Sequence, residues 1–227
     1  MRSNEITIDG DGVLFNYNLG VALLYKEVLC KEAKRVRPGA YHVTNEYDLS
    51  SEKTTAGSFD EHLHSLFTKR NLWERLPAIE GAKEAIDIMI EKGYEVTCLT
   101  SMPTEFEKQR LANAHLHGMK VSSVKAVNRA SAKAQGIRNP KLHYIKTYEP
   151  YAFIDDLLKN FTDMEEIKAN GKTRLVWLDN EYVDDPNAEF DKNMVTETIK
   201  SLLAFAKALP KFVEKEDKFS QSKKSTI

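Results

Sequence analysis

The chain has 227 residues, of which 41% are hydrophobic and 30% charged, a composition typical of a globular protein with one sizeable core and room for a smaller inserted domain. Lys and Arg number 33 against 34 Asp and Glu, so the net charge of −1 argues against a nucleic-acid polymer as a partner. Apolar runs are too short for a membrane span, and two cysteines, Cys30 and Cys98, are too few for a disulfide framework, so we expect a cytoplasmic protein without a membrane partner.

The chain begins with a short β-branched strand, Ile6 to Ile8, that ends in Asp9-Gly10-Asp11-Gly12. An apolar run of this kind fits a strand buried on both faces of a parallel sheet, where ligands bind beyond the carboxyl ends of the strands. Two carboxylates this close repel each other unless a cation lies between them or one is protonated. The spacing fits a Mg²⁺-assisted nucleophile beside a general acid, although Asp and Gly are also ordinary turn formers.

The segment that follows the first strand shows helical rather than strand patterns. Apolar spacing predicts one helix over 19–36, stopped by Arg37-Pro38-Gly39, and a second over 59–72. Residues 40–57 are polar and irregular, and no strand of the main sheet is evident between Asn18 and Pro77. We therefore predict a helical cap over 18–77, inserted into a core formed by 1–17 and 78–210, with a flexible tail over 211–227.

From residue 80 onward the chain alternates helices and strands. The predicted helices cover 80–92, 105–117, 140–148, 157–169 and 195–208, and the predicted strands cover 94–99, 121–127, 151–154 and 174–178. Short connections between alternating elements give a parallel sheet with right-handed crossovers. The expected fold class is α/β, a Rossmann-like parallel sheet with helices on both faces and a small inserted helical cap.

Polar clusters follow three of the predicted strands. Because the carboxyl ends of parallel strands lie at one edge of a sheet, we expect these side chains to come together. Each cluster alone could be a turn or a helix cap, but three at the same edge favour a site. The clusters are Asp9/Asp11, Thr100/Ser101 and Asp155/Asp156.

The run Asp9-x-Asp11-Gly12-Val13-Leu14 resembles the first motif of the haloacid dehalogenase (HAD) superfamily of phosphotransferases. Thr100 resembles its second motif, a strand-end hydroxyl that binds a phosphoryl oxygen, with Ser101 as a helper. Phe153-Ile154-Asp155-Asp156 resembles its acidic fourth motif. For the lysine of the third motif Lys141 fits best, because it begins the helix that leads into the Asp155 strand. The alternatives are Lys133, Lys125 and Lys146.

The resemblance implies a Mg²⁺-dependent phosphohydrolase that acts on a small phosphorylated substrate through an aspartyl-phosphate. Asp9 would be the nucleophile, and Asp11 the general acid and base. Thr100, Ser101 and Lys141 would bind the phosphoryl oxygens. One of the two late aspartates would ligate the metal directly and the other through water. The expected metal ligands are Asp9, Asp11, Asp155 and Asp156.

Within the superfamily, residues 76–82 and the Thr100-Ser101-x-Pro103 run look most like the 5'-deoxyribonucleotidase-type branch with its helical cap. That likeness implies a 5'-nucleotide substrate whose base stacks on cap aromatics, although aromatics at helical spacing more often belong to a core. The candidates for stacking are Phe15, Tyr17, Tyr47, Phe67 and Trp73, and Phe15, Tyr17 and Trp73 are the expected substrate contacts.

Two further patterns are assigned no chemistry. His62-x-His64 and His115-x-His117 have a spacing that places the two rings on different faces of a helix, which disfavours zinc. Asp184-Asp185 is interpreted as turn chemistry. The alternative functions are a catalytically silent relative that binds a phosphate ligand, a phosphatase of another small metabolite, and a receiver domain, which the late position of the acidic pair disfavours.

Overall fold

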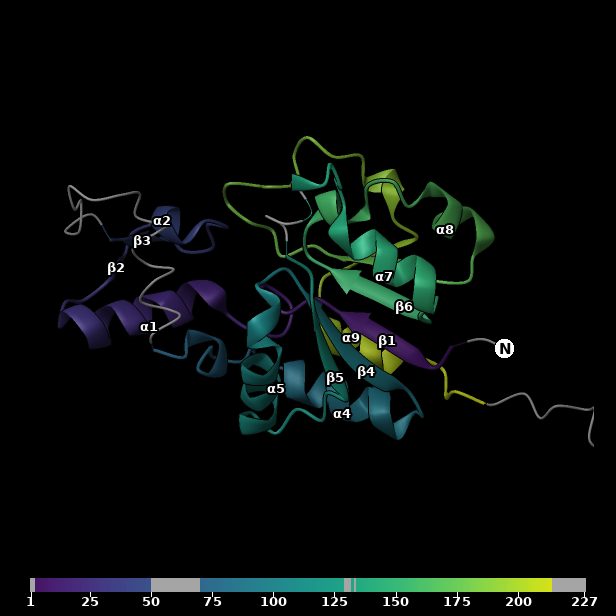
Figure 1. Ribbon diagram of the computed structural model, residues 1–227, viewed down its shortest axis with the longest axis horizontal. Helices are drawn as coiled ribbons and strands as arrows, with labels where there is room; N and C mark the ends of the chain where they lie inside the picture. The colour runs from purple at the N-terminus through teal and green to yellow at the C-terminus, as the bar shows by residue number, and fades with distance from the viewer. Residues whose placement is uncertain (1–2, 50–69, 129–131, 133, 214–227) are drawn as a thin grey trace, which may run out of the picture.

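A computed structural model describes residues 3–49, 70–128, 132 and 134–213. Within them, six strands form one parallel sheet in the order β5-β4-β1-β6-β7-β8 (Figure 1). The strands are β1 Glu5–Ile8, β4 Glu95–Thr100, β5 Ser123–Ala126, β6 Ala152–Asp155, β7 Arg174–Leu178 and β8 Glu197–Ile199.

The register of the central strands determines which residues share the carboxyl edge. Ile8 of β1 lies opposite Cys98 of β4 and Ile154 of β6. The residues that follow on each strand therefore emerge side by side at the same edge. This edge receives Asp9, Thr100 and Asp155.

Helices cover both faces of the sheet, because neighbouring strand residues point to opposite sides. Ile154 and Val176 pack in one apolar cluster with α4 Ala82–Glu91, α5 Glu107–Leu116 and α9 Leu202–Ala208. Phe153, Leu175 and Trp177 pack in a second cluster with α7 Pro140–Tyr148 and α8 Glu165–Asn170, and Figure 1 shows α7 and α8 on the opposite side of the sheet from α4. The predicted α/β class, a Rossmann-like parallel sheet with helices on both faces, is confirmed.

Among the helices predicted beyond residue 80, two are wrong in part. The helix predicted over 195–208 is limited to α9, because Glu197–Ile199 pairs with β7 instead, and Ser201 caps the helix by accepting from the Ala204 N–H at 3.2 Å. The helix predicted over 157–169 is divided into a short 3₁₀ helix, η4 Leu158–Phe161, and α8. Asp163, with a φ of 62°, lies between the two parts.

The described part of the predicted cap is more mixed than the sequence indicated. Helix α1, Tyr17–Leu29, ends where Cys30 takes a left-handed conformation, well before residue 36. A small antiparallel pair follows, β2 Lys34–Arg35 with β3 Tyr47–Asp48, around the short helix α2 Val43–Glu46. Figure 1 places these elements beside the sheet, not on either face.

Two short 3₁₀ helices connect the larger elements, one before the chain returns to the sheet and one after β4. The 3₁₀ helix η2, Leu72–Glu74, precedes α4, and η3, Thr104–Phe106, precedes α5. Most of the helix predicted over 59–72 lies outside the described residues. The division into core, cap and tail remains a prediction. In the described ranges, no helix has the length and apolar character needed to cross a membrane.

Candidate active site

Three buried carboxylates lie together where β1 and β6 end. One oxygen atom from each of Asp9, Asp155 and Asp156 lies within 4.8 Å of the others. One oxygen of Asp156, Oδ1, is buried and has no hydrogen-bond partner among the described residues. Hard carboxylate oxygens with an unsatisfied lone pair are the donor set that Mg²⁺ prefers, so the residues present fit this ion.

Lys141 supplies the cation of this cluster from the first turn of α7. Its Nζ lies 2.6 Å from Asp9 Oδ1 and 2.7 Å from Asp155 Oδ2, and all three side chains are buried. The helix begins there because Pro140 occupies a first-turn position and the Asn139 side chain accepts from the Lys141 N–H at 3.1 Å. Three carboxylates thus face one ammonium, which leaves an excess of buried negative charge.

The electrostatics of the cluster follow from that excess. Burial raises the pKa of Asp9 to about 7, with Lys141 opposing the shift and Asp155 adding to it. Burial and the charges of Asp155 and Asp9 raise the pKa of Asp156 well above its ordinary value. Burial opposes the charged form of Lys141, but Asp155 and Asp9 outweigh it and raise the pKa of the ammonium. A bound divalent cation would balance the charge that burial penalises.

The two hydroxyl residues that were predicted to bind phosphate line the same cavity as the carboxylate cluster. Thr100 Oγ1 and Ser101 Oγ are buried without a hydrogen-bond partner in the described part of the chain, and both residues line a cavity with Asp9. A Cβ on Gly10 would come within 2.9 Å of Thr100 Oγ1, so glycine permits this close approach of β1 to β4. Neither hydroxyl is used as a helix cap, since η3 begins after Pro103 without a side-chain capping bond.

Asp11 lies at the edge of the cluster and pairs with an arginine that the sequence analysis did not identify. Arg110 Nη2 donates to Asp11 Oδ1 at 2.8 Å, and Arg110 is fully buried. Asp11 was expected to ligate the metal as well, but the group of three carboxylates does not contain it. Its carboxylate nevertheless lines the same cavity.

A loop after β7 connects this site to the segment predicted to form a cap, residues 18–77, which is called the cap segment below. Tyr182 donates its hydroxyl to Asp156 Oδ2 at 2.6 Å, and its ring meets the Tyr41 ring edge-on at 5.3 Å. Asp184 accepts from the Tyr41 N–H at 2.5 Å and from Asn45 Nδ2 at 2.7 Å. Asp184 therefore does more than form a turn. Asp185, which accepts from the Asn187 N–H at 2.9 Å, does form one.

The cavity between the cluster and the cap segment has a volume of about 610 Å³. Of the expected substrate contacts, Phe15, Tyr17 and Trp73 all line it, and Tyr41 and Tyr182 join them. Tyr47 is buried elsewhere in the core, and Phe67 lies outside the described residues. The cavity thus joins the polar cluster to an aromatic wall.

Other predicted positions are placed away from the site. Lys125 and Lys146 are exposed, and Lys133 lies outside the described residues. His117 Nε2 lies 2.8 Å from the Leu76 carbonyl and His115 Nε2 lies 3.3 Å from the Val121 carbonyl, so both rings are satisfied. His62 and His64 belong to the segment that is not described.

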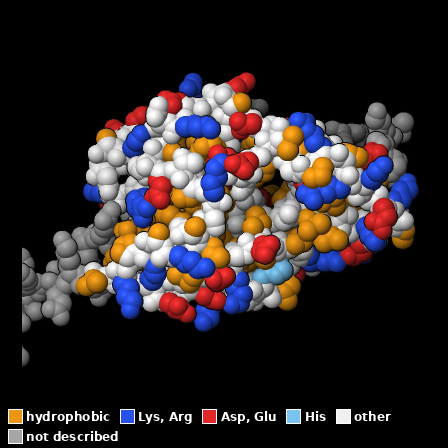
Figure 2. Space-filling view, turned by 180° about the vertical axis from the view of Figure 1, so that it is seen from behind, with side chains coloured by type: hydrophobic (Ala, Val, Ile, Leu, Met, Phe, Trp, Pro, Cys, Tyr) orange, Lys and Arg blue, Asp and Glu red, His pale blue; other side chains and the backbone are white. Residues whose placement is uncertain are grey.

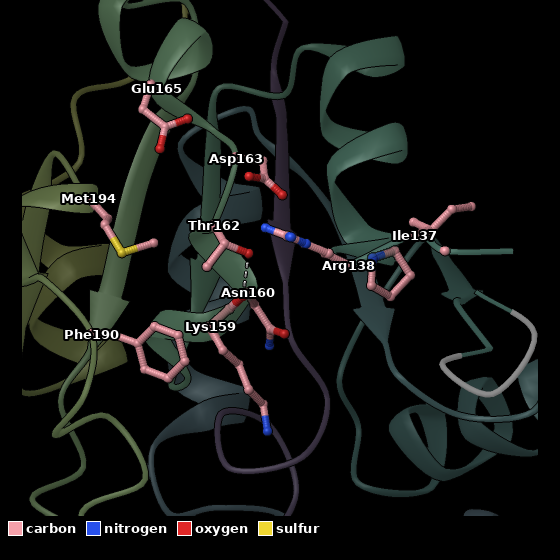
Figure 3. A pocket seen from close by; sticks show the side chains of 11 residues that line it. Ile137, Arg138, Lys159, Asn160, Thr162, Asp163, Glu165, Phe190 and Met194 are labelled. Carbon is pink, nitrogen blue, oxygen red and sulfur yellow. Dashed lines mark hydrogen bonds between the residues drawn. The ribbon is translucent and has the colours of Figure 1, made fainter. Parts of the chain in front are cut away.

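A second cavity, of about 720 Å³, lies beyond η4 (Figure 3). Its wall combines Arg138 and Lys159 with Asp163 and Glu165, and Figure 3 shows Phe190 on one side. The cavity contains none of the predicted site residues in its lining. On the face drawn in Figure 2, basic and acidic side chains are likewise interspersed, without a surface of one sign.

No protein-family model and no curated protein matches the chain. Solved structures match over nearly their whole length. An L-2-haloacid dehalogenase is similar at 12% identity and a TM-score of 0.56, over 91% of this chain and 98% of its own. The chain has the HAD fold. A protein described as a predicted phosphoglycolate phosphatase from Haemophilus somnus 129PT is similar at 15% identity and a TM-score of 0.52, over 91% and 98%.

A protein assigned as a HAD-hydrolase from Bacillus subtilis, bound to magnesium, is similar at 14% identity and a TM-score of 0.52, over 90% of this chain and 97% of its own. These neighbours are HAD-family hydrolases with different reactions. At such identities the likeness is one of fold, so the reaction is argued from the site itself.

Proposed function

We propose that the chain is a Mg²⁺-dependent phosphohydrolase that cleaves a small phosphomonoester through an aspartyl-phosphate on Asp9. The observation that carries the proposal is the buried group of Asp9, Asp155, Asp156 and Lys141. The hydroxyls of Thr100 and Ser101, which were predicted to bind phosphate, line the same cavity and have no hydrogen-bond partner among the described residues. A metaphosphate-like transition state needs such a set of charges and donors around its oxygens.

We assign each step of this reaction to a residue of the site. A carboxylate oxygen of Asp9 attacks phosphorus, and the bond to the leaving oxygen breaks as Asp11 gives that oxygen a proton. Water then attacks the phosphorus of the aspartyl-phosphate, Asp11 takes its proton, and phosphate leaves with Asp9 restored. Lys141, Thr100 and Ser101 bind the phosphoryl oxygens. When bound by Asp9, Asp155 and Asp156, Mg²⁺ would neutralise negative charge that develops on those oxygens.

A 5'-nucleotide is the substrate that we favour, in keeping with the nucleotidase-type resemblance. The aromatic residues that line the 610 Å³ cavity together with Asp9 support this choice, because the half-buried Tyr17 ring offers a base a stacking surface. Another small phosphorylated metabolite is the alternative.

The free thiols of Cys30 and Cys98 support the reducing, cytoplasmic location expected from the sequence.

Phosphate release from a panel of phosphomonoesters tests the reaction class. We expect release from deoxynucleotides, sugar phosphates or p-nitrophenyl phosphate in Mg²⁺, and its loss in EDTA. Chloride release from a 2-chloro acid is measured in parallel, because one structural neighbour is a haloacid dehalogenase. Chloride release without phosphate release would reverse the assignment. No product in either assay, together with Mg²⁺-dependent binding of inorganic phosphate, would favour a silent phosphate-binding protein.

Mg²⁺ affinity is expected to rise about tenfold between about pH 6 and pH 8. The pKa of Asp9 is raised to about 7, so a proton competes with the cation below that pH. In the absence of the cation, the raised pKa contributes stability that is present below the unfolded value of 3.8 and is lost as the pH rises through 7. Mg²⁺ should therefore raise the melting temperature more at pH 8. Calorimetric titration and thermal melts at both pH values test this, and equal affinities would contradict it.

A further inference from the structure

Arg110 is a buried cation whose hydrogen bonds are incomplete. Its exposed fraction is 0%, and Nη2 donates to Asp11 Oδ1 at 2.8 Å. The other two nitrogen atoms of the guanidinium, Nε and Nη1, have no hydrogen-bond partner among the described residues. Burying a guanidinium in this way costs free energy, so stability alone gives no reason for an arginine at this position.

Two aromatic rings fix where the guanidinium lies. Its central carbon is 4.7 Å from the centre of the Phe15 ring and 4.9 Å from that of Trp73. Contacts of a cation with ring faces recover part of the desolvation cost, and they also restrict the plane of the guanidinium. Arg110 is therefore held in one orientation behind Asp11, at the boundary between the sheet domain and the cavity.

Asp11 is the partner that this arrangement orients. Its side chain is 29% exposed and lines the cavity, whereas Arg110 approaches one of its oxygens from the buried side. Among the described residues, no hydrogen bond to the other oxygen of Asp11 competes with this contact. A carboxylate that must first give a proton to the leaving oxygen and then take one from water needs this kind of fixed direction.

We propose that Arg110 is a positioning residue, which holds the Asp11 carboxylate toward the substrate and is present for this task and not for stability. The inference rests on the proposed function, because it takes Asp11 as the group that exchanges a proton with the substrate. Arginine suits the task better than lysine, since a planar guanidinium can contact the faces of both rings while one nitrogen donates to Asp11, whereas an ammonium supplies the charge without this fixed plane.

The substitution Arg110→Met tests this directly. Methionine is unbranched and its thioether packs well against aromatic rings, so it can occupy the space between Phe15 and Trp73. The substitution does not leave Asp11 as a buried unpaired charge, because water reaches its partly exposed side chain. We expect an unchanged or higher Tm, a kcat at least about tenfold lower and a KM changed by less than about threefold. Arg110→Lys should recover part of the lost kcat.

Arg174→Met is the matched control. Arg174 also pairs with a carboxylate, that of Glu197, and its guanidinium lies 5.0 Å from the centre of the Phe205 ring. It begins β7, at the opposite end of the strands from the site. The same substitution there should leave kcat unchanged, and its effect on Tm shows the cost of removing a structural arginine.

The outcomes separate the inference from the proposed function. A wild type that releases phosphate, with Arg110→Met equally active, overturns the positioning role alone. A Tm for Arg110→Met that falls as far as that of Arg174→Met or further, with Arg174→Met destabilised, overturns it as well, because Arg110 would then be structural. A wild type that hydrolyses none of the phosphomonoesters overturns the proposed function and, with it, the role assigned to Asp11.

Discussion

Asp9→Asn is expected to lower kcat for phosphate release by at least about a thousandfold. An amide does not attack phosphorus as a carboxylate does, and Asp9 also belongs to the group of three carboxylates that fits Mg²⁺. The fold should remain, because burial disfavours the Asp9 carboxylate, and Lys141 keeps Asp155 as a partner. Steady-state kinetics and a thermal melt of the purified variant measure the two effects.

Asp87→Asn is the control for that result, since Asp87 is a surface residue of α4 that pairs with Lys83. Its kcat should equal that of the wild type. A ³²P-labelled substrate, quenched in acid, should leave a hydroxylamine-sensitive label on the wild type and none on Asp9→Asn. Substantial turnover by pure Asp9→Asn, or a label that persists on it, would remove the nucleophile assignment.

Lys141→Met is expected to destabilise the protein by about 3–5 kcal/mol near pH 8. The substitution removes the ammonium that lies 2.6 Å from Asp9 and 2.7 Å from Asp155, so two buried carboxylates lose their cation. Without it the pKa of Asp9 rises further, because Lys141 lowers that pKa in the wild type. A carboxyl with a raised pKa contributes stability below its unfolded pKa and loses it as the pH rises, so the loss should be smaller near pH 5.5.

Urea unfolding at both pH values, in EDTA and in Mg²⁺, measures this effect, and Mg²⁺ should restore part of the stability. Lys146→Met is the matched control on the same helix. Lys146 is exposed and lies 3.3 Å from Glu166, a surface pair whose loss should cost no more than about 1 kcal/mol. Equal unfolding free energies for Lys141→Met and Lys146→Met would show that Lys141 is not the cation of the site.

The sheet was predictable because its strands carry a signal of their own. Apolar β-branched runs that alternate with amphipathic helices specify a parallel sheet, and the strand bounds agree with the structure to within one or two residues. β8 was missed because its three residues follow a 3₁₀ helix, η5 Lys192–Met194, and directly precede a strong helical pattern. Only pairing with β7 makes those residues a strand, and a pairing partner is not visible in local sequence.

The carboxylate group was predictable for a related reason, since residues at strand ends are placed by the sheet itself. Arg110 was missed, although the helix held a signal. Arg110 and Asn113 are three residues apart, so two polar side chains share one face of α5, and both are buried. Tyr182 lies in a loop after β7, and its contact with Asp156 depends on the folded path of that loop. No local pattern could have indicated it.

The loop that carries Tyr182 has a thermodynamic consequence. Asp184 holds the backbone of the cap segment at Tyr41, while Tyr182, two residues away, donates to a carboxylate of the candidate metal site. The two contacts share one short stretch of backbone, so a ligand that stabilises one arrangement of the loop biases both. Linkage makes this coupling reciprocal. If a bound cation raises the affinity for a ligand in the cavity by some factor, that ligand must raise the affinity for the cation by the same factor.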